Sequence, residues 1–305
     1  MSDAHMTRPA ATEVPVPEGD RSDHPLRRGE AFRFGDQPVV ETPGGLRVPK
    51  LGLGTYELEG DQCREMVAVA LELGVRHIDT AQGYGNESGV AAGIAASGVP
   101  REEIFVTTKV DNDNHEPGEL TRSVEASLER LDTDHVDLLL IHWPVHWEIV
   151  NATLNTLAQV QASGMAHHIG VSNFTVEQLD QVAHLAPLEV LQVECHPFLQ
   201  QRELRSWCVD AGWVFTAYSP VARGAVMDDE TLVEIAAARS TSPATVALAW
   251  LLAQDGVIAI PRTGDPDHLR ANWEALSLEL SPDELARIDQ LDEGRRLIDP
   301  DHAPW

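Results

Sequence analysis

The chain has 305 residues, 43% of them hydrophobic, which is enough for one large α/β domain or two medium ones and excludes global disorder. It carries 49 acidic against 22 basic residues, a formal net charge of −27, and only Lys50 and Lys109 are lysines. This composition excludes a protein that binds nucleic-acid phosphates or anionic membranes, since both need clustered cations, and it is typical of a protein working in concentrated salt.

Residues 1–37 differ in composition from the rest of the chain. Four prolines stand among mixed charges before residue 30, with almost no apolar periodicity. We predict that residues 1–37 form a disordered, acidic and proline-rich N-terminal extension and that residues 38–305 form one domain. The turn sequence Thr42-Pro43-Gly44-Gly45 lies between two short extended runs and predicts a β-hairpin at the start of this domain.

Short apolar runs then alternate with amphipathic stretches. The apolar runs are Leu51–Thr55, His77–Ala81, Ile104–Val110, Val136–Ile141, Ala166–Val171, Val190–Cys195, Trp213–Tyr218 and Val257–Ile260. The expected helices cover 61–73, 86–97, 118–131, 151–163, 175–185, 201–211, 230–254 and 266–276, and a capping box at Ser281 starts a last one. Apolar strands predict a parallel sheet buried on both faces, and eight such units predict a (β/α)8 TIM barrel. A doubly wound sheet is the alternative, which we disfavour because no linker interrupts residues 51–280.

The cysteines and the apolar runs indicate where the protein works. Cys63, Cys195 and Cys208 are scattered and form no CxxC motif, which fits a reducing compartment. The longest apolar runs are far shorter than the roughly 20 residues that span a bilayer, and no secretory signal opens the chain. We therefore expect a cytoplasmic protein.

The ends of neighbouring strands carry a chemically coherent set of side chains. Active sites of such barrels lie at the carboxyl ends of the strands, where Asp79, Lys109 and His142 stand, with Tyr84 in the loop after Asp79. A cation beside a phenol lowers its pKa, and a carboxylate fixes that cation in place. We predict that Asp79 and Lys109 tune Tyr84 as a general acid and that His142 holds the substrate oxygen. Lys109 is the strongest candidate because the chain has so few lysines.

Each of these residues also has a plain structural explanation. Asp79 alone can cap a loop, Lys109 alone can be a partly buried ion-pair partner, and His142 alone can be a core histidine. The function therefore depends on the set and not on any one member.

A metal-dependent barrel hydrolase is the enzymatic alternative. His77, His168 and His196 add nitrogen ligands to the candidate residues. However, His77 and His168 fall early in their strands, near the end of the barrel that usually serves stability. His167 and His168 are adjacent in a strand and cannot point the same way. We therefore expect no metal.

Several segments, in order, resemble the aldo-keto reductase superfamily. They are Leu51–Thr55 (LGLGT), Asp79–Ala81 with Tyr84–Glu87, Thr107–Lys109, Asp137–Pro144 (DLLLIHWP), Ile169–Phe174 (IGVSNF) and Tyr218–Pro220. The resemblance covers about residues 39–305 and points to the compact bacterial type, similar to 2,5-diketogluconate reductases and methylglyoxal-type carbonyl reductases. It implies a (β/α)8 barrel that binds NADP(H), sometimes NAD(H), and transfers a hydride from nicotinamide C4 to a small-molecule aldehyde or ketone.

The resemblance also implies residue roles. Tyr84 becomes the proton donor, Lys109 and Asp79 its tuning pair, and His142 the orienting residue. The implied cofactor contacts are Ser172, Asn173 and Gln192 on the carboxamide, Tyr218 on the nicotinamide ring, Ser219 on the pyrophosphate, and Arg262, Thr263, His268 and Asn272 at the adenosine end. The implied substrate pocket is lined by Tyr56, Trp143 and Trp147, with Asp111 where many relatives have tryptophan.

The phosphate-binding positions depart from the usual pattern of that family. Relatives usually have lysine at position 262 and arginine at position 268, whereas this chain has Arg262 and a largely neutral His268. Because Arg262 can hold a phosphate with two hydrogen bonds, we expect NADP(H), with NAD(H) also used. The short loops after the fourth and seventh strands predict an open pocket, and relatives of this size suggest a monomer.

A nucleotide-sensing regulatory subunit on the same barrel is the alternative from another functional class, because a fold does not fix a function. The glycines of Gly83–Gly89 imitate a dinucleotide-binding fingerprint, but their spacing is GxGxxxG. The next strand also ends in Lys109, where that fingerprint needs an acid. The complete catalytic set favours an enzyme, an NADP(H)-dependent carbonyl reductase.

Overall fold

Eight short apolar runs form a parallel sheet. The structure is a computed structural model that describes residues 34–305. The strands are β3 (Leu53–Gly54), β4 (His77–Asp79), β5 (Phe105–Val110), β6 (Val136–Ile141), β7 (Ala166–Ser172), β8 (Leu188–Glu194), β9 (Val214–Tyr218) and β10 (Val257–Ala259). Each strand pairs in parallel with the next one along the chain. Every residue of β5 and β6 is buried, as expected for a sheet covered on both faces.

The first and last strands also meet, and this contact closes the sheet. Parallel bridges join Leu51 to Ala259 and Gly54 to Arg262. A Cβ at position 54 would lie 2.8 Å from the Ile260 carbonyl oxygen, so the closing contact requires glycine there. The predicted (β/α)8 barrel is confirmed. The doubly wound alternative is wrong, because the strand order runs without reversal and both edge strands are joined.

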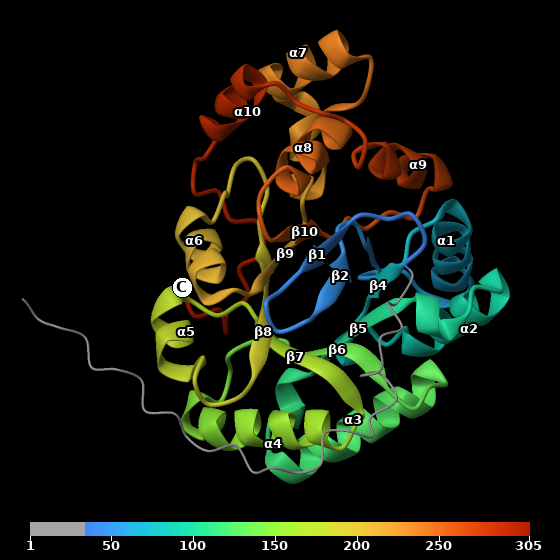
Figure 1. Ribbon diagram of the computed structural model, residues 1–305, viewed down its shortest axis with the longest axis vertical. Helices are drawn as coiled ribbons and strands as arrows, with labels where there is room; N and C mark the ends of the chain where they lie inside the picture. Colours follow the sequence, from blue (N-terminus) through green and yellow to red (C-terminus); the bar gives the residue numbers. More distant parts are fainter. Residues whose placement is uncertain (1–33) are drawn as a thin grey trace, which may run out of the picture. The chain divides into compact units, whose positions relative to one another are not determined.

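Helices follow the strands and surround the sheet (Figure 1). They are α1 (Gly60–Leu73), α2 (Glu87–Ser97), α3 (Pro117–Leu131), α4 (Val150–Ala162), α5 (Val176–Val182), α6 (Arg202–Ala211), α7 (Glu230–Arg239), α8 (Pro243–Leu252), α9 (Pro266–Glu274) and α10 (Pro282–Asp289). The predicted capping box is present, since Ser281 and Glu284 exchange hydrogen bonds between side chain and backbone. No described helix is long and apolar enough to cross a membrane.

The predicted hairpin lies at the amino ends of the strands. It consists of β1 (Val39–Glu41) and β2 (Arg47–Pro49), paired antiparallel and drawn in blue in Figure 1. A Cβ on Gly44 in its turn would lie 2.6 Å from the Glu189 carboxylate, at the start of β8. The turn also approaches Gly212, just before β9. The opposite, carboxyl ends of the strands therefore belong to a different surface from the hairpin.

The described chain packs against the barrel from its first residues. Phe34 is buried with its ring edge-on to Phe105, and Gln37 bonds the backbone of Leu51 and Arg76. Residues 1–33, which make up most of the predicted extension, lie outside the described residues.

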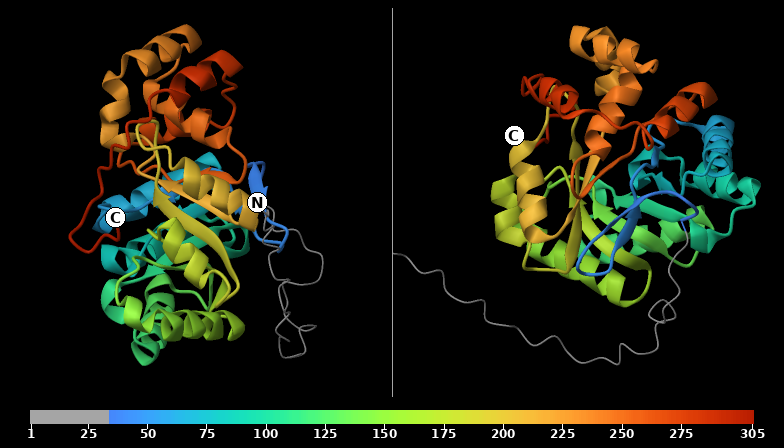
Figure 2. Two further views of the ribbon diagram at one scale, coloured as in Figure 1. Left: turned by 90° about the vertical axis from the view of Figure 1, so that its left-hand side faces the viewer. Right: turned by 45° about the horizontal axis from the view of Figure 1, so that its top comes forward.

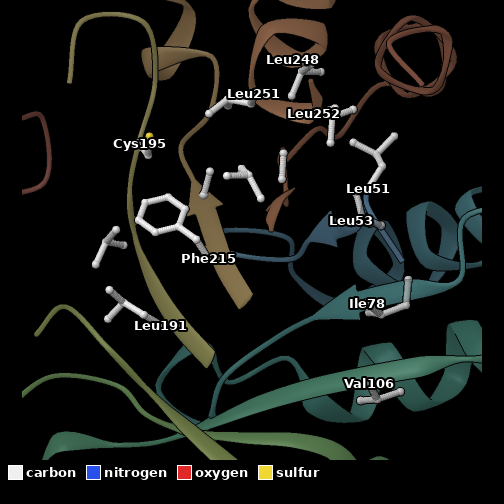
Figure 3. Packing of buried hydrophobic residues seen from close by; sticks show 14 of the residues in the cluster. Leu51, Leu53, Ile78, Val106, Leu191, Cys195, Phe215, Leu248, Leu251 and Leu252 are labelled. Atoms are coloured by element: carbon white, nitrogen blue, oxygen red, sulfur yellow. The ribbon is translucent and has the colours of Figure 1, made fainter. Parts of the chain in front are cut away.

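The hydrophobic core lies between the sheet and the helices. Figure 3 shows Leu51 beside Leu248 and Leu252 of α8, with Phe215 and Ile78 on neighbouring strands of the same hydrophobic cluster. Every α8 residue from 245 to 252 is buried, which suits a helix that is apolar all round. The views in Figure 2 show α8 next to the sheet, and they show α7 and α10 farther from the sheet than α8. This rigid frame positions the strand ends.

Candidate active site

A lysine and an aspartate meet inside the barrel at the carboxyl ends of β4 and β5. The Lys109 ammonium lies 2.5 Å from the Asp79 carboxylate and donates to the Thr80 carbonyl oxygen at 2.8 Å. It also lies 3.3 Å from the hydroxyl of Tyr84, in the short turn after β4. Lys109 is 0% exposed and Asp79 is 1% exposed, so the pair is shielded from water. Three of the four predicted catalytic side chains are therefore in direct contact.

Burial and charge act on the pKa of Tyr84 in opposite directions. Burial raises this pKa, the Lys109 ammonium lowers it, and the net direction is upward. Lys109 thus lowers the Tyr84 pKa as expected, but desolvation, which the expectation did not consider, has the larger effect. Burial alone would lower the pKa of Lys109, but Asp79 and Tyr84 together raise it. Both groups therefore hold their protons at neutral pH.

His142 follows β6 and faces the tyrosine. Its ring centroid lies 5.7 Å from that of Tyr84, edge to face. Burial, together with Lys109 and two neighbouring histidines, lowers the pKa of His142 to about 3. The imidazole is therefore neutral at physiological pH and has one N–H to donate. Tyr56 stands edge-on to Tyr84 at 5.1 Å and is 48% exposed, so it forms an outer rim.

Buried polar side chains continue the site at the ends of β7 and β8. Ser172, Asn173 and Gln192 are each at most 2% exposed. The Gln192 amide donates to the second carboxylate oxygen of Asp79 at 2.8 Å, which ties this group to the catalytic set. Asn173 has a left-handed backbone with φ of 65°, and its amide donates to the His142 carbonyl oxygen. The amide carbonyl of Asn173 accepts the hydroxyl of Tyr218 at 2.8 Å.

The chain after β9 is strongly bent. Ser219, Ala222 and Arg223 all have left-handed backbones although none is glycine. Such conformations each cost roughly 1–3 kcal/mol and cluster at binding sites. Ser219 follows Tyr218 directly, so the bend begins beside the buried polar group.

The predicted adenosine-end residues divide into a buried and an exposed pair. Thr263 and Asn272 are buried, whereas Arg262 and His268 are exposed. Arg262 extends from the end of β10 to the loop after β3, where it donates to the Tyr56 and Glu57 carbonyl oxygens at 3.1 Å each. The structure thus fixes the guanidinium near the rim while leaving it accessible.

Acidic side chains surround the start of α9. Asp265 caps this helix, and Asp267 pairs with Arg270 at 2.5 Å. Arg262 itself forms an ion pair of 3.8 Å with Glu57. The predicted adenosine-end surface therefore carries the Arg262 guanidinium together with the carboxylates of Glu57, Asp265 and Asp267.

The C-terminal tail adds a wall that sequence reasoning missed. Trp143 is 7% exposed and packs against the rings of His302 and Trp305, and Arg296 lies 3.6 Å from the Trp305 ring. The buried Glu194 carboxylate holds the tail by accepting backbone N–H groups at 297 and 298. The short tail is therefore anchored and packs against Trp143. The sequence signal for this contact was Glu194, an acidic residue at the end of an apolar strand.

Two predicted pocket residues have other contacts. Trp147 packs on Phe174 and lines a surface hollow with residues of α4 and α5. Asp111 lies against the turn Gln82–Tyr84, because its carboxylate would be 2.5 Å from a Cβ on Gly83. The structure groups Tyr56 and Trp143 near the catalytic set, and it places Trp147 in the helix layer.

The histidines weighed as metal ligands do not converge on this site. His77 bonds the Thr107 hydroxyl and His168 bonds Glu189 at 2.6 Å, both toward the amino ends of their strands. His196 contacts Glu194. The position that a cation would take beside Asp79 holds the Lys109 ammonium instead, which opposes binding of a second positive charge there.

Comparison with known proteins agrees with this geometry. A profile of the aldo/keto reductase family matches residues 50–293. An aldo-keto reductase of Mycobacterium sp. (strain MCS) is 41% identical over 88% of this chain and 95% of its own length. A glyoxal reductase of Bacillus subtilis is 39% identical over 85% of this chain and 94% of its own length.

A solved structure gives the same result for the fold. The crystal structure of a protein described as a 2,5-diketo-D-gluconic acid reductase B superposes with a TM-score of 0.85 at 36% identity, over 89% of this chain and 97% of the other. The chain therefore belongs to the aldo/keto reductase family, oxidoreductases that act on aldehydes and ketones and generally use NAD(P)H.

Proposed function

We propose that the chain is an NADP(H)-dependent carbonyl reductase in which Tyr84 is the general acid. One observation carries the proposal: the Lys109 ammonium bridges the Asp79 carboxylate at 2.5 Å and the Tyr84 hydroxyl at 3.3 Å. A phenol that gives up its proton becomes an anion, and a fixed cation beside it stabilises that anion. The protonated resting tyrosine is the state that a general acid needs.

Each side chain then has one task in the reaction. A nicotinamide cofactor, when bound, would supply the hydride for the carbonyl carbon. Tyr84 donates its proton to the carbonyl oxygen, and Lys109 stabilises the phenolate that remains. Asp79 keeps the ammonium in place. His142, neutral because burial lowers its pKa to about 3, donates an N–H to the same oxygen and orients the carbonyl.

The polar groups beyond Tyr84 fit a nicotinamide cofactor. A carboxamide offers both donors and acceptors, and Ser172, Asn173 and Gln192 offer the complementary groups at buried strand ends. Tyr218, fixed by its bond to Asn173, supplies a flat face for the ring. The left-handed bend from Ser219 supports a close approach of backbone to pyrophosphate.

The choice between the two cofactors depends on the adenosine end. Arg262 would hold the ribose 2′-phosphate, because it is accessible and held by two backbone carbonyl oxygens. Thr263 and Asn272 would hold the neighbouring polar atoms. Asp265, which caps α9 nearby, opposes a phosphate by charge. We therefore propose NADP(H) as the first cofactor and NAD(H) as a usable second one.

Small carbonyl compounds are the proposed substrates. The rim is aromatic, with Tyr56 on one side and Trp143, backed by Trp305, on the other. Such a pocket suits a compact, partly polar molecule rather than a long chain. Relatives named glyoxal reductase and 2,5-diketo-D-gluconic acid reductase support dicarbonyls within this class.

The experiment is a panel of aldehydes, dicarbonyls and keto-sugars followed by absorbance of NADPH and of NADH, at low and high KCl. We expect turnover of small dicarbonyls and a higher kcat/KM with NADPH. A strong preference for NADH would overturn the cofactor proposal. Binding of either cofactor without turnover of any carbonyl would favour a nucleotide-sensing regulatory subunit instead.

We also propose the compartment in which the protein works and its oligomeric state. All three cysteines are free and buried, which supports a reducing compartment such as the cytoplasm. Burial raises the pKa of the Cys195 thiol to about 12, so this group is unreactive. The net charge of −27 disfavours contact between copies, so we propose a monomer in solution. Light scattering at several salt concentrations tests this.

A further inference from the structure

A second cluster of ligand-type side chains lies at the amino ends of β6 and β7, opposite the candidate active site. His135 precedes β6, Asp137 is in β6, and His167 is in β7. His135 and Asp137 are two residues apart along an extended chain and so share a face. The register pairs residue 136 with 166 and residue 138 with 168, which puts Asp137 beside His167.

The ligand atoms of the three side chains are close together. One from each residue lies within 4.8 Å of the others, and the two imidazole rings stack with centroids 4.1 Å apart. Ligands around tetrahedral zinc at about 2.0–2.1 Å are roughly 3.4 Å apart. The lone pairs of stacked rings lie in nearly parallel planes, so binding requires one imidazole to rotate as well as a closure of the three ligand atoms. The His135 side chain is 23% exposed, which leaves it room to turn.

The neighbouring groups orient two of these ligands. Asp134 bonds Nδ1 of His135 at 2.6 Å, which assigns the metal-binding lone pair to Nε2. One oxygen of Asp137 accepts the Val106 N–H at 2.9 Å and contacts Arg101 at 3.0 Å. A carboxylate behind a ligating histidine is the usual arrangement at protein metal sites.

The charges around the cluster favour a cation despite Arg101. Asp134 and Asp137 together outweigh that guanidinium. The adjoining surface hollow around Asp134 is acidic, since four of its six lining residues are Glu125, Glu129, Asp132 and Asp134 itself. A negative surface concentrates cations near the site.

We propose that His135, Asp137 and His167 bind one divalent transition-metal ion of the zinc type. Two imidazoles and a carboxylate are ligands that zinc prefers, with water as the fourth. Within residues 34–305 this is the one set of three histidine, cysteine or carboxylate side chains whose ligand atoms all lie within 4.8 Å of one another. His168, which follows His167 in the sequence, bonds Glu189 instead and is not part of this set.

The metal would be structural and not catalytic. His135 and His142 stand at opposite ends of β6, and seven steps along the strand at about 3.3 Å each put them roughly 23 Å apart. An ion at the amino end would link β6 to β7. Because it binds the folded chain, it would raise the melting temperature by several degrees at saturation.

The test is titration of chelator-treated full-length protein with Zn²⁺ by calorimetry and with Co²⁺ by visible absorption. We expect one equivalent with a tetrahedral cobalt spectrum, a higher melting temperature and unchanged carbonyl reduction. His135→Ala and His167→Ala should each weaken this binding at least about tenfold. Asp134→Asn, which keeps all three ligands, should weaken it less.

His168→Ala is the matched control and should bind as the wild type does. Circular dichroism checks that each variant is folded. The proposal is overturned if the wild type binds no equivalent of either metal, or if the His135 and His167 variants keep wild-type affinity. Equal loss in the His168 variant would also overturn it, because the effect would then be non-specific.

Discussion

One strand, β6, joins two histidines in opposite surroundings. His142 follows its carboxyl end, where burial and the Lys109 ammonium lower its pKa to about 3. His135 precedes its amino end, keeps a side chain that is 23% exposed and bonds Asp134. The first is a neutral imidazole beside a buried ammonium, and the second is a partly exposed imidazole beside a carboxylate. The same residue type acquires a different chemistry from its neighbours and its burial.

The two lysines repeat this contrast. Lys109 is fully buried at a carboxyl end, against Asp79 and Tyr84. Lys50, before β3, is half-buried and donates to the Leu252 carbonyl oxygen at 3.0 Å. The carboxyl ends hold a buried ion pair shielded from water, whereas Lys50 before β3 makes a part-buried hydrogen bond to the end of α8. Four variants or conditions test this contrast before the central one.

Removing Lys109 should have the largest effect. Lys109→Met should lower kcat/KM by about 10²–10⁴, because the phenolate loses its cation. It should also lower the free energy of unfolding by about 3–5 kcal/mol, because Asp79 stays buried without a positive partner. Steady-state kinetics and urea unfolding measure the two losses. The control Lys50→Met should cost at most about 2 kcal/mol and leave kcat unchanged. Similar activity in both variants would break the contrast.

Acid should destabilise the barrel through histidines at both of its ends. Burial lowers the pKa of His77 to about 4 and that of His142 to about 3, whereas unfolded histidine titrates near 6.5. The unfolded chain therefore binds more protons below pH 6.5, and stability falls as pH falls. At pH 5 the loss should be about 2 kcal/mol per histidine.

His77→Gln separates the two ends in this pH series. Unfolding measured from pH 7 to 5 should depend less on pH than in the wild type, while carbonyl reduction at pH 7 stays unchanged. A pH dependence identical to that of the wild type would show that His77 titrates normally in the fold.

Removing Arg262 should have a smaller effect, confined to the cofactor. Arg262→Ala should raise the KM for NADPH about tenfold and change that for NADH much less, because it removes a charged hydrogen bond to phosphate. Arg122→Ala, an exposed arginine of α3, serves as the control for lost charge. Equal changes for the two cofactors would place the phosphate elsewhere.

Salt should have the smallest effect, spread over the whole surface. Raising KCl from low to molar concentration should raise the melting temperature by a few degrees. At about 1 M salt the Debye length falls to about 3 Å, which weakens the repulsion among the 49 acidic residues. Scanning calorimetry measures this, and a flat curve would remove the salt-adapted interpretation. The buried Lys109–Asp79 pair should not weaken over the same range.

Much of the barrel was predictable because its signals are local. The run Val136–Ile141 coincides with β6, and strand ends in a parallel sheet must gather at one edge, which brought Asp79 and Lys109 together in the prediction. The apposition of these two charges needed no knowledge of side-chain packing.

The parts that were missed depend on distant contacts. Glu194 and the tail at Trp305 are far apart in sequence. Only the folded chain shows that Glu194 binds the tail backbone and that Trp305 packs on Trp143. The direction of the Tyr84 pKa depends on desolvation, which sequence spacing does not report. The set of His135 and His167 requires the register of β6 against β7.

The central claim is that Tyr84, held against the buried Lys109 ammonium, delivers the proton in carbonyl reduction. The most direct measurement compares Tyr84→Phe with the wild type by single-turnover reduction and by fluorescence titration of NADPH. The account predicts a loss of turnover of about 10²–10⁴ with nearly unchanged NADPH affinity, because only the hydroxyl is removed. Turnover close to that of the wild type, with the cofactor bound, would contradict it.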